Sequence, residues 1–213
     1  MNNGVIVELA RENEEMSNVD RLVNLYHLLS QVLVFGVPGE VAEFGCHAGK
    51  TAVFLRMVID HFDPTRPFHV FDSFRGLPAP GPQDAYLREG DCAATADELR
   101  ATFSRWSARL PIIHEGWFES TLPRELPERI AFAYVDADFY DSTLTVLSRI
   151  YPRLSPRAII CFDDYADHER NPRAWGGLPG VKRACDDFFA DKPEEVNVLI
   201  GNGDLAFGMV RKG

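Results

Sequence analysis

The sequence lacks the marks of a membrane, secreted or nucleic-acid-binding protein. No apolar run approaches the roughly 20 residues that cross a bilayer, and residues 1–16 are acidic and contain no long apolar core of the kind found in signal peptides. Four cysteines occur without a Cys-x-x-Cys pair, which favours reduced thiols over a disulfide framework. Basic residues are in deficit: 22 Lys and Arg against 32 Asp and Glu give a formal charge of −10, which disfavours a nucleic-acid partner. We therefore expect a cytoplasmic protein with no membrane or nucleic-acid partner.

The chain also lacks internal repeats, low-complexity segments and linker-like stretches. With 213 residues, of which 46% are hydrophobic and 11% aromatic, it is large and apolar enough to bury one core. Residues 1–213 are therefore predicted to form a single domain.

What the sequence does contain is a regular alternation of apolar strands and amphipathic helices. Helices are predicted at residues 17–36 (with Ser17 as N-cap), 51–62, 95–106, 142–151 and 178–191. Strands are predicted at residues 41–45, 67–72, 111–116, 130–136 and 157–164, followed by a hairpin in which 195–200 and 205–212 flank the turn Gly-Asn-Gly-Asp. This order predicts an α/β protein with a doubly wound, mostly parallel sheet of seven strands that ends in an antiparallel hairpin. Ligands of such sheets bind at the carboxyl ends of the strands.

The first predicted strand runs into a glycine turn, EFGCHAGKT at residues 43–51, that nearly matches a phosphate-binding P-loop. A P-loop places four residues between its glycines, so that successive N–H groups wrap the phosphates. Gly45 and Gly49 enclose only three residues, and the turn does not match Gly-x-Gly-x-x-Gly either. A P-loop NTPase therefore stays a distant alternative.

Two acids end the first two predicted strands and indicate a different ligand. Glu43 beside the glycine turn would repel phosphate but attract an ammonium or a hydroxyl group. Asp72 ends the second strand, at a position that reaches the ribose of a bound nucleoside in doubly wound sheets. S-adenosylmethionine has a ribose, a cationic amino-acid tail and no phosphate, so it suits both positions. The alternative is that Glu43 and Asp72 only cap neighbouring helices.

Acids also end the predicted strands 130–136 and 157–164. Because neighbouring parallel strands lie about 4.8 Å apart, Asp136, Asp163 and Asp164 converge if these strands are adjacent. Three carboxylates cannot share a dry cleft without a cation, and an oxygen-only ligand set favours Mg²⁺ or a similar hard ion over zinc. The alternative is helix capping, which is predicted for Asp141 before the helix that begins at Ser142.

A metal ion at this place would bind a substrate hydroxyl, lower its pKa and hold it in line with a methyl donor. One of the acids would then take the proton. Asp136 and Asp138 are both candidates for this base, and the sequence does not choose between them. Residues 75–95, rich in proline and glycine, form a long loop of the kind that often serves as a lid.

Together, these motifs resemble the macrocin O-methyltransferase (TylF/MycF-like) family of class I methyltransferases. The similar stretches follow the family's order over most of the chain: residues 21–52, 70–78, 116–123, 134–156, 161–168 and 181–189. The first turn departs from the family, which usually has Val-Trp-Arg-Gly where this chain has Cys46-His47-Ala48-Gly49.

The resemblance implies a Rossmann-like fold, S-adenosylmethionine as donor, and Mg²⁺-dependent O-methylation of a small hydroxylated acceptor, typically a sugar in a natural-product pathway. It implies that the donor is bound by Glu43, Gly45, Cys46, Asp72, Ser73, Gly116, Trp117 and Asp136. The implied metal ligands are Asp136, Asp163 and Asp164. Loop 166–180 follows the aspartate pair and is expected to shape the acceptor pocket, where His168 and Arg170 are candidate substrate contacts.

Two other functions stay open at this point. The chain could be a metal-independent methyltransferase in which the aspartates orient an amine, or a non-catalytic module that only binds S-adenosylmethionine. The sequence does not identify the acceptor or the position methylated. It also leaves the oligomeric state undecided, a homo-oligomer included.

Overall fold

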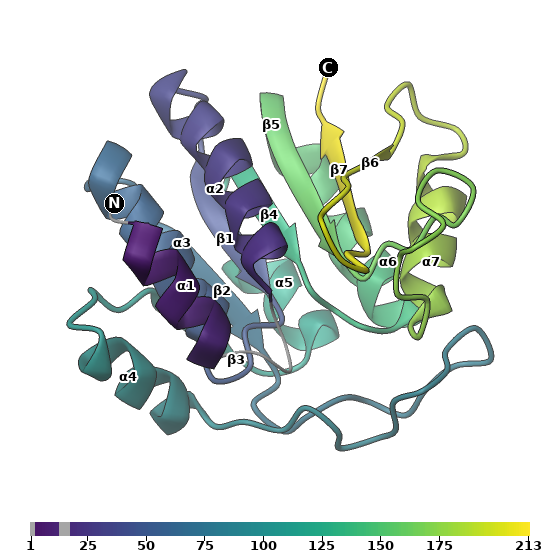
Figure 1. Cartoon of the computed structure of the whole chain (residues 1–213), viewed down its shortest axis with the longest axis horizontal. Coiled ribbons are helices and arrows are strands. Elements are labelled where there is room, and N and C mark those ends of the chain that lie inside the picture. Colours follow the sequence, from purple (N-terminus) through teal and green to yellow (C-terminus); the bar gives the residue numbers. More distant parts are fainter. Residues whose placement is uncertain (1–2, 13–17) are drawn as a thin grey trace.

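The computed structural model describes residues 3–12 and 18–213 of the chain (Figure 1). The helices are α1 (Asn3–Glu12), α2 (Val19–Val34), α3 (Lys50–Phe62), α4 (Ala96–Arg105), α5 (Phe118–Glu125), α6 (Tyr140–Ile150) and α7 (Pro179–Phe189), with a 3-10 turn η1 (Tyr151–Arg153). The strands are β1 (Glu40–Phe44), β2 (Phe68–Asp72), β3 (Ile112–Glu115), β4 (Ile130–Val135), β5 (Leu154–Asp163), β6 (Asn197–Val198) and β7 (Phe207–Arg211).

One seven-stranded sheet runs through the centre of the molecule in the order β3-β2-β1-β4-β5-β7-β6. Strands β1 to β5 are parallel, and β7 is antiparallel to both β5 and β6. The predicted doubly wound, mostly parallel sheet with antiparallel strands at its C-terminal end is confirmed. The strand order reverses between β1 and β4, and ligands of α/β sheets bind outside the carboxyl ends of the strands at such a point.

Helices cover both faces of the sheet, which explains why β1, β2 and β4 are buried along nearly their whole length. Leu25 and Leu29 of α2 pack with Phe54 of α3 in a core on one face. Leu122 of α5 and Val146 of α6 belong to the core on the other face, together with residues of α7. Figure 1 shows α1 to α4 grouped away from α6 and α7. None of the helices in the described part of the chain is long and apolar enough to cross a membrane.

The helix starts show which predicted caps form. Thr95 and Glu98 make the expected capping box of α4. Ser17, the predicted cap of the next helix, lies outside the described residues, and the cap observed is Asn18, whose side chain accepts from the Arg21 N–H. The prediction for Asp141 is wrong, because α6 begins at Tyr140 and that residue's N–H donates to the distant Asp84 carboxylate.

Three further elements differ from the sequence-based expectation. Helices α1 and α5 were not predicted; α5 is short and contains Pro123, so its apolar period is hard to detect. The C-terminal hairpin forms, but residues 199–206 separate its strands instead of a tight Gly-Asn-Gly-Asp turn. The backbone of this segment is held by side chains from other elements: the Asn202 N–H donates to Asp20, and Arg173 donates to the Gly201 carbonyl.

Candidate active site

A first cleft, called the donor cleft below, opens at the carboxyl ends of β1, β2 and β4. Its lining residues surround about 830 Å³ of space, part of which is open to solvent. Of the residues predicted to bind a donor, the cleft is lined by Gly45, Asp72, Ser73, Trp117 and Asp136. Glu43, Cys46 and Gly116 are not among its lining residues. Other lining residues were not predicted to bind the donor, and most of them come from loop 75–95 and the first turn of α5: His47, Leu77, Cys92, Phe118 and Glu119.

Gly45 allows the first turn to lie against the end of β4. Its φ is 84°, and a Cβ atom built on it would lie 1.8 Å from the Asp136 carbonyl oxygen. The Asp136 N–H donates to the Phe44 carbonyl at 2.8 Å, so the ends of β1 and β4 are joined at this point. A side chain at position 45 would therefore separate the two strand ends that form the floor of the cleft.

Asp72 fixes the same turn from the neighbouring strand. Its Oδ2 accepts from the Cys46 and His47 N–H groups, both at 2.9 Å, and its Oδ1 accepts from Phe74 N–H at 2.8 Å. These three bonds orient the carboxylate at the edge of the donor cleft. Oδ2 accepts two of them and Oδ1 only one, so Oδ1 retains a lone pair for a ligand hydroxyl.

Glu43 is buried beneath this turn, with 1% of its surface exposed. Its Oε2 is buried and has no hydrogen-bond partner among the described residues. Burial, and secondarily the nearby Asp72 charge, raise the pKa of Glu43 well above the ordinary value of a glutamate. An unpaired buried carboxyl costs stability, so a role other than stabilising the fold is expected for it.

A second cleft, called the acceptor cleft below, adjoins the first. The two clefts share Asp136, Asp138 and Cys92. Loop 75–95 contributes residues to both clefts, and the acceptor cleft is also lined by residues from the start of α2, loop 166–180 and the segment before β7. A ligand in one cleft therefore reaches a ligand in the other at the two aspartates.

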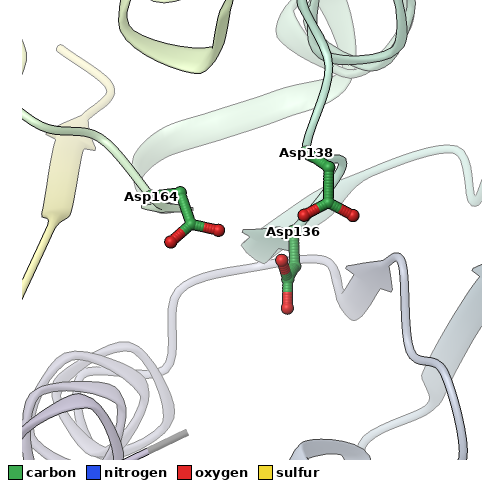
Figure 2. Close-up of side chains that lie close together, drawn as sticks. All are labelled: Asp136, Asp138 and Asp164. Atoms are coloured by element: carbon green, nitrogen blue, oxygen red, sulfur yellow. The ribbon is translucent and has the colours of Figure 1, made fainter. Parts of the chain in front are cut away.

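An acidic cluster lies at this junction. One carboxylate oxygen from each of Asp136, Asp138 and Asp164 can be chosen so that all three lie within 4.8 Å of one another. Figure 2 shows the three side chains converging from the segments that follow β4 and β5. Burial is the main cause that raises the pKa of Asp138 to about 7 and the pKa values of Asp136 and Asp164 well above the ordinary range, and Asp163 adds to all three. Such a cluster gains from a cation that neutralises it.

The backbone at two of these aspartates is strained. Asp138 has φ 57° and Asp164 has φ 55°, in the left-handed region that aspartate tolerates better than most residues. The Phe139 N–H donates to the Ala137 carbonyl, so Asp138 is the central residue of a tight three-residue turn. Strain of this kind commonly accompanies a functional site.

Asp163 lies outside the acidic cluster. Its Oδ1 is 2.6 Å from the Arg21 Nε, and its Oδ2 accepts from the Tyr134 hydroxyl at 2.7 Å. Arg21 comes from α2 and also lies 3.7 Å from Asp164. The structure thus groups two of the three predicted metal ligands, Asp136 and Asp164, with Asp138, and pairs the third with an arginine.

The two predicted substrate residues, His168 and Arg170, line neither cleft. His168 Nε2 is 2.9 Å from the Ala174 carbonyl oxygen, and Arg170 donates to the Val196 carbonyl at 2.8 Å. The residues of loop 166–180 that reach the acceptor cleft are Trp175 and Leu178. A tryptophan next to two glycines in a long loop is the sequence signal that could have identified Trp175 as a site residue.

The geometry argues against a P-loop. Lys50, which stands where the P-loop lysine would be, donates to the Glu12 carbonyl of α1 at 2.5 Å. Among residues 3–12 and 18–213, those that line the donor cleft include Asp72, Glu119, Asp136 and Asp138 but neither lysine nor arginine. A triphosphate would meet like charge on several sides.

Comparison with known proteins finds a family and several relatives. The macrocin-O-methyltransferase (TylF) family matches residues 10–187. The chain is 36% identical over 162 residues to the 8-demethyl-8-(2,3-dimethoxy-alpha-L-rhamnosyl)-tetracenomycin-C 4'-O-methyltransferase of Streptomyces olivaceus, an alignment that covers 71% of this chain and 62% of that enzyme. It is 34% identical over 180 residues to the mycinamicin III 3''-O-methyltransferase of Micromonospora griseorubida, covering 75% of this chain and 71% of that enzyme. Among solved structures, the O-methyltransferase NovP matches with a TM-score of 0.75 at 25% identity, over 92% of this chain and 80% of NovP. The chain thus spans less than two thirds of the tetracenomycin enzyme.

Proposed function

The chain belongs to the macrocin O-methyltransferase (TylF) family, and on that basis we propose that it transfers a methyl group from S-adenosylmethionine to a sugar hydroxyl of a natural product. The tetracenomycin and mycinamicin enzymes are both named as O-methyltransferases, and the name of the tetracenomycin substrate includes a rhamnosyl group. The observation that carries the proposal is the pair of adjoining clefts that meet at Asp136 and Asp138.

The donor cleft suits S-adenosylmethionine. Asp72 Oδ1 offers its remaining lone pair to a ribose hydroxyl, with Ser73 beside the carboxylate, and Trp117 offers an aromatic face to the adenine. In the described part of the chain, neither lysine nor arginine lines this cleft, which fits a donor that carries no phosphate. Glu43 lies behind the turn, where its unpaired carboxyl would attract the ammonium of the methionine tail.

The acidic cluster suits a hard divalent cation, because its three carboxylates each offer an oxygen and these oxygens lie within 4.8 Å of one another. Asp136, Asp138 and Asp164 would hold Mg²⁺ or a similar ion. When bound, the ion would neutralise the cluster and acidify an acceptor hydroxyl. Asp163, joined to Arg21 and Tyr134, would hold the end of β5 in position instead of contacting the ion.

Asp138 is the residue that we assign as the proton acceptor. It lines both clefts, and one of its oxygens suffices for the cluster, leaving the other for the acceptor hydroxyl. The Tyr134 hydroxyl lies 3.5 Å from Asp136 Oδ2, whereas among the described residues no side chain donates a hydrogen bond to the Asp138 carboxylate. Asp138→Asn is expected to lower kcat by at least about 100-fold while the affinity for S-adenosylhomocysteine stays unchanged.

Loop 75–95 would act as the lid of both clefts. It is closed on itself by bonds from Leu77 N–H to the Asp91 carbonyl and from Gly90 N–H to the Leu77 carbonyl. Asp84 attaches its outer part to α6 through Tyr140. Limited proteolysis with and without S-adenosylhomocysteine tests this role: cleavage within 75–95 should slow in the ligand's presence, and an unchanged rate contradicts it.

Isothermal titration with S-adenosylhomocysteine, in Mg²⁺ and in EDTA, is the test of the donor site. Binding in both buffers supports a donor cleft separate from the cation, and no binding in either refutes the proposal. Methyl transfer to mycinamicin III or to the demethylated tetracenomycin rhamnoside, followed with labelled donor, then tests the acceptor class. Activity that persists in EDTA would favour a metal-independent methyltransferase.

A further inference from the structure

The mouth of the acceptor cleft carries two aromatic side chains to which no role has been assigned. Tyr86 belongs to loop 75–95 and Trp175 to loop 166–180, and both line the cleft. Their rings meet edge to face, with centroids 5.2 Å apart and planes at 83°. Tyr86 is 74% exposed and Trp175 is 37% exposed. Exposed aromatic groups beside a cleft usually mark a binding surface.

The backbone holds Tyr86 in this place at a cost. Its φ is 71°, and the Leu87 N–H donates to the Ala85 carbonyl at 2.8 Å. Tyr86 is therefore the centre of a γ-turn of the rare kind with positive φ. A bulky residue in this conformation is an outlier that points to function when it lies at a site.

Trp175 is positioned by its own surroundings. The backbone N–H of Trp175 donates to the Asp204 carbonyl at 2.8 Å, and this bond joins loop 166–180 to the segment before β7. A Cβ atom on Gly177 would lie 2.1 Å from the Trp175 ring. Glycine at position 177 thus leaves the space that the indole occupies.

The charges of the acceptor cleft limit which acceptor can use these rings. Of the residues that the structure describes, five aspartates line it against one arginine, Arg21, which is paired with Asp163; the aspartates are Asp136, Asp138, Asp163, Asp164 and Asp204. The five carboxylates still outnumber the three positive charges that Arg21 and one divalent cation would supply. The cleft therefore repels the diphosphate of a nucleotide-activated sugar and suits a neutral molecule.

We propose that Tyr86 and Trp175 bind the apolar aglycone of a neutral glycoside, whose sugar extends inward to Asp138. This assignment rests on the proposed methyltransferase function and adds two specificity-determining residues to it. The sugar is then already attached to its aglycone when it is methylated, so a glycosyl transfer must supply the substrate.

The test is equilibrium binding to protein saturated with S-adenosylhomocysteine and Mg²⁺. Three probes share L-rhamnose, the sugar in the name of the tetracenomycin relative: 4-nitrophenyl α-L-rhamnoside, methyl α-L-rhamnoside and thymidine diphosphate L-rhamnose. We expect the nitrophenyl glycoside to bind at least tenfold more tightly than the methyl glycoside, and the nucleotide sugar to bind more weakly than the nitrophenyl glycoside.

Variants then test whether Tyr86 and Trp175 cause the preference for the nitrophenyl glycoside over the methyl glycoside. Tyr86→Ala and Trp175→Ala should each reduce the nitrophenyl-over-methyl ratio below about threefold, with the affinity for S-adenosylhomocysteine unchanged. Tyr86→Phe and Trp175→Phe should retain most of it. Gly177→Ala, which moves the indole without replacing it, should act like Trp175→Ala.

Several results would overturn the assignment. The first is a ratio of nitrophenyl to methyl glycoside affinity that is the same in the wild type and the alanine variants. The others are a nucleotide sugar that binds more tightly than both glycosides, and a nitrophenyl glycoside that does not bind. A wild type that does not bind S-adenosylhomocysteine would instead refute the proposed function, so the two failures are distinguishable.

Discussion

Substitution of Asp163 by asparagine tests which aspartates bind the metal ion. The sequence predicts Asp163 as a ligand, whereas the structure places Asp138 in the acidic cluster instead. Asp163 is 3% exposed and pairs with Arg21, which is 12% exposed, at 2.6 Å. Breaking a buried pair by removing one partner costs about 3–5 kcal/mol. Asparagine keeps an acceptor for the Tyr134 hydroxyl, and Arg21 retains Asp164 at 3.7 Å. We therefore expect a loss of about 2–3 kcal/mol, which corresponds to a Tm lower by roughly 4–12 °C for a chain of this length.

The matched control is Asp164→Asn, the same chemical change at the next residue. Asparagine tolerates the φ of 55° at this position as aspartate does, and the change removes one of several mutually repelling acids. Its free energy of unfolding should change by less than about 1 kcal/mol. Its affinity for Mn²⁺ should fall at least about tenfold, because a cluster carboxylate is lost.

Urea unfolding and isothermal titration with Mn²⁺ measure the two quantities on both variants. Asp163→Asn should lose stability and keep its Mn²⁺ affinity within about threefold, a range that corresponds to less than 1 kcal/mol. Asp163→Asn that is as stable as the wild type but fails to bind Mn²⁺ would refute the reasoning. It would restore Asp163 as a metal ligand, as the family resemblance implies.

Three further predictions concern the donor cleft. Asp72→Asn should weaken S-adenosylhomocysteine binding at least about tenfold by calorimetry, because it removes a charged acceptor at the ribose position; an unchanged Kd would exclude that contact. Gly45→Ala should destabilise the protein by at least about 2 kcal/mol in urea, because its Cβ would lie 1.8 Å from the Asp136 oxygen, whereas Gly203→Ala, with open space around it, should be nearly neutral. Glu43 has a raised pKa, so its carboxyl makes the folded state less stable as pH rises above the usual glutamate pKa of about 4.3. The free energy of unfolding of Glu43→Gln should therefore rise relative to that of the wild type between pH 5 and pH 8. A difference between the two proteins that is equal at both pH values would contradict a raised pKa of Glu43.

The sequence by itself determined most of the secondary structure and the edge of the sheet at which the clefts lie. Apolar strand runs and helical periodicity are local patterns, so β1 to β5 and α2, α3, α4, α6 and α7 could be located within a few residues of their ends. The acids at strand ends indicated the functional edge, because parallel strands bring their carboxyl ends together. The spacing of Gly45 and Gly49 in the first turn made a P-loop a distant alternative without any coordinates.

Only the tertiary structure decided how these residues are paired. Arg21 and Asp163 are 142 residues apart in the chain, and their ion pair depends on the packing of α2 beside β5. Asp138 joins the acidic cluster because a positive φ turns the chain back at that residue. Tyr86 and Trp175 meet because two long loops are anchored to different elements, at Asp84 and at Asp204. Such contacts depend on long-range geometry, which local propensity and periodicity do not encode.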